Sequence, residues 1–223
     1  MQMHVVDPLP ADISAARIRN KLRMAGMDEA RDLLDRSIPL IHARAAYGTA
    51  YVDHVGDDGV KIEGRWFKSR VLVKNLENVG RVFPYLLTLG PVLDDRADSS
   101  GDMLEKYYLD EIGNMALRRA RDRFEAHLRE KFALEKIACM SPGSLDDWPL
   151  EEQRPLFDLL DEARKALEMR LTASCLMLPR KSLSGIYFPS ETTFFSCQLC
   201  PREDCEGRKA AYSEKLAREY GII

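Results

Sequence analysis

The sequence predicts an α+β fold in which a twisted antiparallel sheet packs against long helices. Three observations support this class. A hairpin pattern surrounds the turn at residues 57–59, the apolar run from Val82 to Leu89 is typical of a buried strand, and residues 102–136 form the longest helical pattern in the chain. An antiparallel hairpin combined with long helices indicates α+β rather than a parallel α/β arrangement.

The first part of the chain is predicted to be helical and then to change to strands. Ser14 is a suitable N-cap for a short helix that Gly26 would end, and Asp28 opens a second helix that Pro39 would kink or shorten. From Thr49 onward the pattern becomes β. Strands are expected at residues 51–55, 60–62 and 71–73.

The long helix over 102–136 has an apolar face, and Gly113 within it indicates a close packing contact. The residues of that face are Leu104, Tyr108, Ile112, Met115, Leu117, Phe124 and Leu128. Beyond a proline-containing loop, the remaining elements follow in order. They are a helix from Leu150 to Glu168, a strand from Leu183 to Phe188 and a closing helix from Glu206 to Tyr220.

Composition excludes several classes of function. The 223 residues are 45% hydrophobic and 31% charged, with a net charge of −3 and a pI near 5.9, so neither nucleic acid nor an anionic membrane surface is an expected partner. The basic run from Arg118 to Arg123 is offset by nearby acidic residues, which favours a solvated helix face. With no secretory or membrane-spanning pattern, a cytoplasmic location is expected.

Three of the five cysteines lie within nine residues, at Cys197, Cys200 and Cys205, with the spacing C-x2-C-x4-C. Thiolates at this spacing can surround one metal ion or cluster, and Pro201 stiffens the loop between them. The pattern therefore predicts a metal site. Reduced, partly buried thiols and a redox C-x-x-C pair are the alternatives, and the redox pair is disfavoured because no thioredoxin-like pattern surrounds it.

A tetrahedral zinc or a fully protein-ligated iron–sulfur cluster needs a fourth ligand. Cys139 and Cys175 are the candidates, because the histidines at 42, 54 and 127 are remote in sequence. Three cysteines alone would leave one iron of a cluster open. An iron–sulfur cluster is favoured and zinc is the alternative.

Residues 171–188, with the sequence LTASCLMLPRKSLSGIYF, resemble a motif of the activation domain of cobalamin-dependent methionine synthase. That motif has the pattern L-T-x-S-x-x-M-x-P-x-x-S-x-S-G-x-Y-F. The upstream loop at Pro142 and Gly143, and the helix from Met103 to Lys131, resemble the parts of the domain that precede it. The resemblance covers roughly residues 80–190 and is strongest to a stand-alone version with a cysteine-rich tail.

The resemblance implies a role in corrinoid reactivation. In that family an electron from a flavodoxin and a methyl group from S-adenosylmethionine return cob(II)alamin to methylcobalamin. Pro142, Gly143 and Tyr187 match positions that would border the adenosyl ligand. The partner it implies is a corrinoid-binding methyltransferase, methionine synthase above all, which carries the cobalamin. An electron donor would be a further partner.

Two positions depart from the family pattern. The family loop begins with an arginine that pairs with the ligand's carboxylate, and a tyrosine follows its glycine; here these positions are Cys139 and Ser144. A thiol cannot replace the charge-assisted, bidentate contact of a guanidinium. It does place Cys139 where it could join the C-terminal cysteines as a ligand of an electron-transfer site.

Three parts of the chain follow from these features: an N-terminal helical segment (1–48), an activation-like domain (49–190), and a cysteine cluster with a C-terminal helix (191–223). The favoured function is that of an accessory protein for reductive reactivation of a corrinoid methyltransferase through a cysteine-ligated iron–sulfur or metal site. The alternatives are a docking module with structural zinc, and an S-adenosylmethionine-binding activation domain.

Overall fold

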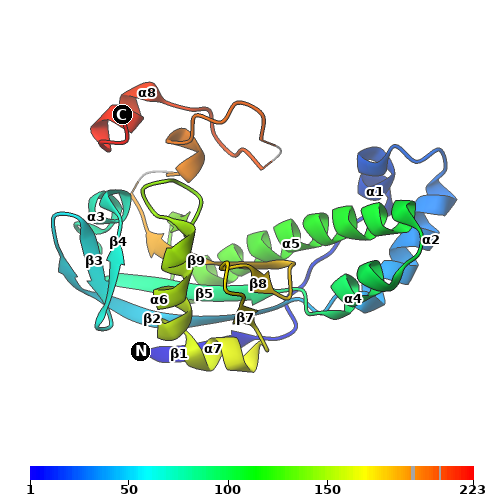
Figure 1. The fold of residues 1–223 in the computed structure, drawn as a ribbon, viewed down its shortest axis with the longest axis horizontal. Helices are drawn as coiled ribbons and strands as arrows, with labels where there is room; N and C mark the ends of the chain where they lie inside the picture. Colours follow the sequence, from blue (N-terminus) through cyan, green and yellow to red (C-terminus); the bar gives the residue numbers. More distant parts are fainter. Residues whose placement is uncertain (192–193, 206) are drawn as a thin grey trace.

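The computed structural model describes residues 1–191, 194–205 and 207–223, and within these residues seven strands form one antiparallel sheet (Figure 1). Along the sheet the strands are β4 (Arg65–Lys68), β3 (Gly59–Ile62), β2 (Arg44–Val55), β5 (Arg81–Thr88), β9 (Ser182–Pro189) and β6 (Ile137–Met140). A further strand, β1 (Gln2–Val6), pairs with the first half of β2. The predicted α+β class is confirmed.

One long helix and several short ones surround the sheet. In chain order they are α1 (Ala15–Leu22), α2 (Met27–Ser37), α3 (Arg70–Leu76), α4 (Val92–Ser99), α5 (Met103–Lys131), α6 (Gln153–Leu159), α7 (Asp161–Ala166) and α8 (Glu214–Glu219). Short 3-10 turns cover Ile38–Leu40, Leu150–Glu152 and Ser196–Gln198, and β7 (Arg170–Leu171) pairs with β8 (Met177–Leu178) as a separate ribbon. No helix of the described chain combines the length and apolar character needed to cross a membrane.

Each face of the sheet has its own apolar core, because side chains alternate along a strand. Ala46, Leu86 and Ile186 belong to the first core, which also contains residues of α3, α6, α7 and the C-terminal segment. Tyr85 and Tyr187 belong to the second core, where α5 supplies Ala120, Phe124 and Leu128. The N-terminal half of α5 extends past the sheet and packs against α1 and α2 (Figure 1).

Most of the predicted elements are confirmed, with changed boundaries. Ser14 caps α1 as predicted, but α1 ends at Arg23 in the left-handed conformation, and Gly26 instead precedes α2. The predicted helix from Leu150 to Glu168 is broken at Leu160 into α6 and α7. The closing helix is shorter than predicted, since it starts after the cap Ser213, and its predicted start at Glu206 lies outside the described residues.

The prediction of a strand over residues 71–73 is wrong, because α3 occupies that segment. Its valines favour a strand, yet Ser69 caps the helix by accepting a hydrogen bond from the Leu72 amide at 3.0 Å. Asp147, from the loop before α6, accepts from the Ser69 hydroxyl at 2.6 Å and from the Val71 amide at 2.9 Å. These contacts satisfy the first amides of the helix and lower the pKa of Asp147 against the opposing effect of burial. Tertiary contacts thus override the local strand preference.

Neither β7 nor β8 of the separate ribbon was anticipated from the sequence, and three strands of the seven-stranded sheet were not anticipated either. These are β1, β4 and β6, which are short and partly exposed. Because β1 lies within residues 1–48 and pairs with β2, the first segment contributes to the central sheet as well as to helices. The division of the chain into three parts stays a prediction.

Candidate functional site

A cavity of about 180 Å³ lies at the β6 edge of the sheet. Strands β5, β6 and β9 contribute Tyr85, Cys139 and Tyr187 to its wall, and helix α5 contributes Arg121 and Glu125. The tail, here defined as residues 194–205 and 207–209, forms another part of the wall through Phe194, Phe195, Ser196, Cys197, Gly207 and Lys209. Residues far apart in sequence therefore meet around one small space.

Strand register explains why these side chains share one face. Cys139 lies opposite Tyr187 in the β6–β9 pair, and Tyr85 lies opposite Gly185 in the β5–β9 pair. Directly opposite residues of antiparallel strands project to the same side of a sheet. The ring of Tyr187 lies 4.9 Å from that of Tyr85 and 5.8 Å from that of Phe124, measured between centroids. Packing thus holds the Tyr187 ring at the cavity.

There is no room for a side chain at position 185, where the motif has a glycine. A Cβ on Gly185 would lie 2.5 Å from the carbonyl oxygen of Met140 and 2.7 Å from the hydroxyl of Ser141. Both distances are shorter than any normal contact, so only glycine lets β6 approach β9 this closely. The motif glycine therefore has a packing role that places Cys139 beside Tyr187.

Burial keeps two tyrosines and one thiol of the cavity wall neutral. It raises the pKa of Tyr85 and of Tyr187 well above the ordinary value for tyrosine, with the nearby Cys139 adding to the effect. It also raises the pKa of the Cys139 thiol to about 11, and the thiol donates to the Tyr85 hydroxyl at 3.7 Å. Cys139 is consequently a thiol and not a thiolate near neutral pH, which makes it a poor nucleophile and a poor metal ligand until it loses its proton.

Two buried polar atoms of the cavity residues have no hydrogen-bond partner within the described part of the chain. They are the hydroxyl of Tyr187 and Nε of Arg121. A terminal nitrogen of Arg121 pairs with Asp122 at 3.1 Å. Burial alone would lower the pKa of Arg121, but the contact with Asp122 outweighs it, so the pKa is raised. A buried donor without an acceptor costs about 1–3 kcal/mol, so a ligand or water that accepts from these two groups would be stabilised at the cavity.

The loop after β6 contains the predicted adenosyl-binding residues Pro142 and Gly143. Its serines, Ser141 and Ser144, line the cavity, whereas Pro142 is buried beside them and Gly143 is exposed. Gly143 has φ +78° and donates its amide to the Trp148 carbonyl at 2.7 Å, which closes the turn. Of the three predicted positions, Tyr187 borders the cavity directly, and the other two shape the loop at its rim.

The tail cysteines occupy three different environments. Cys197 lines the cavity and its sulfur accepts the Lys209 amide at 3.5 Å, while Cys200 packs against the apolar core that contains Ile186. Cys205 is exposed. Of the two candidates for a fourth ligand, Cys139 shares the cavity with Cys197, whereas Cys175 is buried in the 172–176 turn and is not part of the cavity wall.

Arg208 organises the cysteine loop. Its guanidinium donates to the carbonyl oxygens of Cys197 at 3.1 Å and Cys200 at 3.3 Å, and it also contacts the carbonyls of Arg202 and Ala210. Across the described chain, no group of three or more His, Cys, Asp or Glu side chains is placed to hold a metal ion. As placed, the cysteines do not fit a zinc ion or an iron–sulfur cluster, whose thiolates must converge on one centre.

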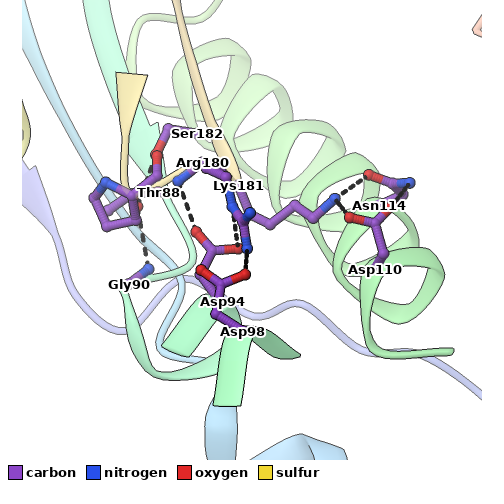
Figure 2. Close-up of polar contacts among 10 residues, drawn as sticks. Thr88, Gly90, Asp94, Asp98, Asp110, Asn114, Arg180, Lys181 and Ser182 are labelled. Atoms are coloured by element: carbon purple, nitrogen blue, oxygen red, sulfur yellow. Dashed lines mark hydrogen bonds and ion pairs between the residues drawn. The ribbon is translucent and has the colours of Figure 1, made fainter. Parts of the chain in front are cut away.

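A second, larger hollow of about 490 Å³ lies near Pro179, at the approach to β9. Figure 2 shows that three charged residues of its wall pair with one another, since Arg180 contacts Asp94 and Asp98. Beside the hollow, Lys181 donates to Asp110 at 2.6 Å. Ser182 donates to Thr88 at 2.9 Å, which joins the start of β9 to the end of β5. These contacts anchor the motif to α4 and α5 and leave the edge cavity as the better candidate site.

Sequence reasoning missed Arg121, Glu125 and Tyr85. The charge balance of the run from Arg118 to Arg123 predicts a solvated helix face, and this prediction is wrong for Arg121, whose side chain is only 27% exposed. A signal was available, because Arg121 stands at helical spacing with Leu117, Phe124 and Leu128 on the buried face of α5.

Comparison with known proteins agrees with the predicted resemblance. Residues 125–211 match the family model described as vitamin B12 dependent methionine synthase, activation domain. A solved structure of the MetH reactivation domain bound to AdoHcy has the same fold, with a TM-score of 0.57 and 17% identity over 87% of this chain and 81% of that chain. No curated protein matches the sequence significantly. Most of the cavity wall, from Glu125 to Lys209, lies within the matched residues.

Proposed function

Because residues 125–211 match the activation domain of vitamin B12 dependent methionine synthase, we propose that the chain takes part in reductive reactivation of a cobalamin-dependent methyltransferase, with methionine synthase as the favoured partner. The edge cavity is its ligand site. The observation that carries the proposal is the pair of buried, unpartnered donors, the Tyr187 hydroxyl and Arg121 Nε, within a cavity built largely from the matched residues. The electron comes from a separate donor.

S-adenosylmethionine is the proposed ligand of the cavity, since a protein of this fold was solved with AdoHcy. The residues present fit one end of such a molecule: they supply donors in Tyr187 and Arg121 and a carboxylate in Glu125. At about 180 Å³ the cavity is smaller than the roughly 300–1,000 Å³ of pockets that enclose a whole small ligand. The tail forms one wall, so we expect the adenosine part to bind only as the tail moves away from α5.

The first test is binding of AdoHcy and S-adenosylmethionine, measured by isothermal titration calorimetry. We expect saturable binding, weakened about 3- to 10-fold by Tyr187→Phe, because this change removes one hydroxyl and keeps the ring. Tyr107→Phe, at an exposed position of α5, is the matched control and should leave the affinity unchanged. Absence of binding to the unmodified chain would refute the proposed ligand.

Reactivation is tested in trans. A methionine synthase lacking its own activation domain is converted to the cob(II)alamin form and mixed with this chain, S-adenosylmethionine and a chemical reductant. We expect the cob(II)alamin absorbance to be replaced by that of methylcobalamin only when the chain is present. If the conversion is equally slow with and without the chain, the proposed partner is wrong.

The iron–sulfur or zinc site stays a prediction. One feature supports it, because Cys139 and Cys197 border the same cavity. Binding a cluster would require the loop to release the Arg208 guanidinium and turn Cys200 and Cys205 inward. From the placement of the cysteines we expect protein purified without oxygen to contain less than one equivalent of iron or zinc. Iron and sulfide in comparable amounts, lost in Cys197→Ala, would instead establish the cluster.

A further inference from the structure

Two of the four histidines of the chain pack against one buried tyrosine, Tyr47 of β2. His4 comes from β1, where it lies directly opposite Tyr47, and its ring centre is 5.0 Å from that of the tyrosine. His127 comes from α5, with a ring separation of 5.8 Å. Lys131, one turn after His127, lies over the same tyrosine ring at 5.3 Å. These four residues, here called the histidine clasp, join β1 to β2 and to α5.

The hydrogen bonds of His4 require its neutral ring. An ammonium has no lone pair, so Lys131 can only donate, and Nδ1 of His4 accepts at 3.2 Å. The proton of the neutral ring is then on Nε2, where it donates to the Thr49 hydroxyl at 3.4 Å. A second proton, added at Nδ1, would replace the contact with Lys131 by two positively charged donors that face each other.

The charged surroundings of the clasp also oppose protonation. Lys131 and His127 act on His4, while Lys131 and Glu130 act on His127, whose Nε2 lies 3.2 Å from the buried Tyr47 hydroxyl. Glu130 is exposed, and it is the single carboxylate among these groups of the described chain. Helix α7 also contacts β1, but it packs in the core on the other face of the sheet. Charging both rings would therefore gather three positive groups around one tyrosine.

Burial and then the charge of Lys131 lower the pKa of both histidines below the ordinary value of 6.5. The unfolded segment consequently binds these protons more readily than the folded one. The stability that the neutral rings contribute is fully present above pH 6.5 and is lost as the pH falls below that value. Acid thus acts on the clasp in the range where histidines titrate.

We propose that the histidine clasp is an acid-sensitive switch, in which protonation of His4 and His127 releases β1 from β2 and from α5 while the rest of the sheet stays folded. Strand β1 can leave alone, because it pairs with β2 and lies off the path that joins the other strands. Once released, His4 reaches water, where its charge no longer faces Lys131. The inference does not rest on the proposed function, since it needs no ligand in the edge cavity.

The test is amide hydrogen exchange of the full chain, followed by mass spectrometry at neutral and at mildly acidic pH and corrected for the intrinsic effect of pH. One unit below its pKa of 6.5, a released histidine is protonated about ten times more often than not. Protection of residues 2–6 should therefore fall about 10-fold at that pH, whereas β5 and β9 should keep theirs.

His4→Gln is the decisive variant, because an amide can accept from Lys131 and donate to Thr49 without titrating. Its β1 should be equally protected at both pH values. His54→Gln, at an exposed position of β2, is the matched control and should show the same loss as the unmodified chain. Should His4→Gln not fold, Lys131→Met serves the comparison, since it removes the facing charge and should make the loss smaller.

Three results would overturn the switch. One is equal protection of β1 at both pH values in the unmodified chain. Another is an undiminished acid loss in His4→Gln or, where that variant does not fold, in Lys131→Met. The third is a loss shared equally by β1, β5 and β9, which would mean that the whole sheet opens together. Because AdoHcy takes no part in these measurements, their outcome is independent of the proposed ligand.

Discussion

Phe124→Ala should lower the free energy of unfolding by about 3–5 kcal/mol, a large share of the stability of an ordinary domain. Phe124 is fully buried between α5 and the sheet, and its ring lies 5.3 Å from that of Tyr85 and 5.5 Å from that of Tyr47. Alanine would leave a void where three aromatic rings now meet. Urea unfolding followed by circular dichroism measures the change.

The same substitution should weaken AdoHcy binding, because Tyr187 loses a packing partner at 5.8 Å. Tyr107→Ala is the control: it removes an aromatic ring from the same helix at a position that is 51% exposed, so the change should stay within about 0.5 kcal/mol. A loss below 1 kcal/mol for Phe124→Ala would contradict the packing described for this face.

Gly185→Ala should destabilise the protein by about 1–3 kcal/mol and reduce AdoHcy binding at least 10-fold. Replacing glycine by alanine in a strand normally stabilises a protein, because alanine restricts the conformations of the unfolded chain. Here its Cβ would lie 2.5 Å from a backbone oxygen of β6, which cannot rotate away as a side chain could. Strand β6 must therefore shift, and Cys139 and the Ser141–Ser144 loop shift with it.

Gly80→Ala provides the matched control for the glycine experiment. A Cβ at Gly80 would meet no atom within 4 Å, so alanine there should be neutral or stabilising by about 0.4–1 kcal/mol. Unfolding curves and calorimetric titrations of both variants make the comparison. Equal stability of the two alanine variants would mean that β6 and β9 do not need the close approach.

The cysteines show which properties of a site sequence spacing can predict and which it cannot. Spacing placed Cys197, Cys200 and Cys205 in one short loop, and that is where they lie. Spacing could not show that Cys200 packs against an apolar core while Cys205 faces solvent, because these environments depend on elements more than 100 residues away, such as β2 and β5. The predicted proximity of Cys139 came from the family resemblance, and both it and Cys197 border the cavity.

Position 139, where the family pattern has an arginine and this chain has a cysteine, is a second case. Motif comparison showed that this strand position has a thiol, and it could not show that another guanidinium, that of Arg121, lies in the same cavity. The two residues are 18 positions apart, on a helix and on an edge strand. Their meeting depends on the burial of Phe124 and Leu128 against the sheet, which orients the whole helix.

Local pattern was enough to predict the α+β class and most helices and strands, because periodicity and caps are properties of neighbouring residues. The motif at residues 171–188 was enough to predict the resemblance to the methionine synthase activation domain. Three-dimensional packing settled three further points. It made residues 70–76 a helix, separated the sulfurs of the tail, and brought Arg121, Glu125 and Tyr187 around one cavity. These three outcomes depend on contacts between segments that are distant in sequence. Such contacts stabilise the protein only when both apolar cores are buried.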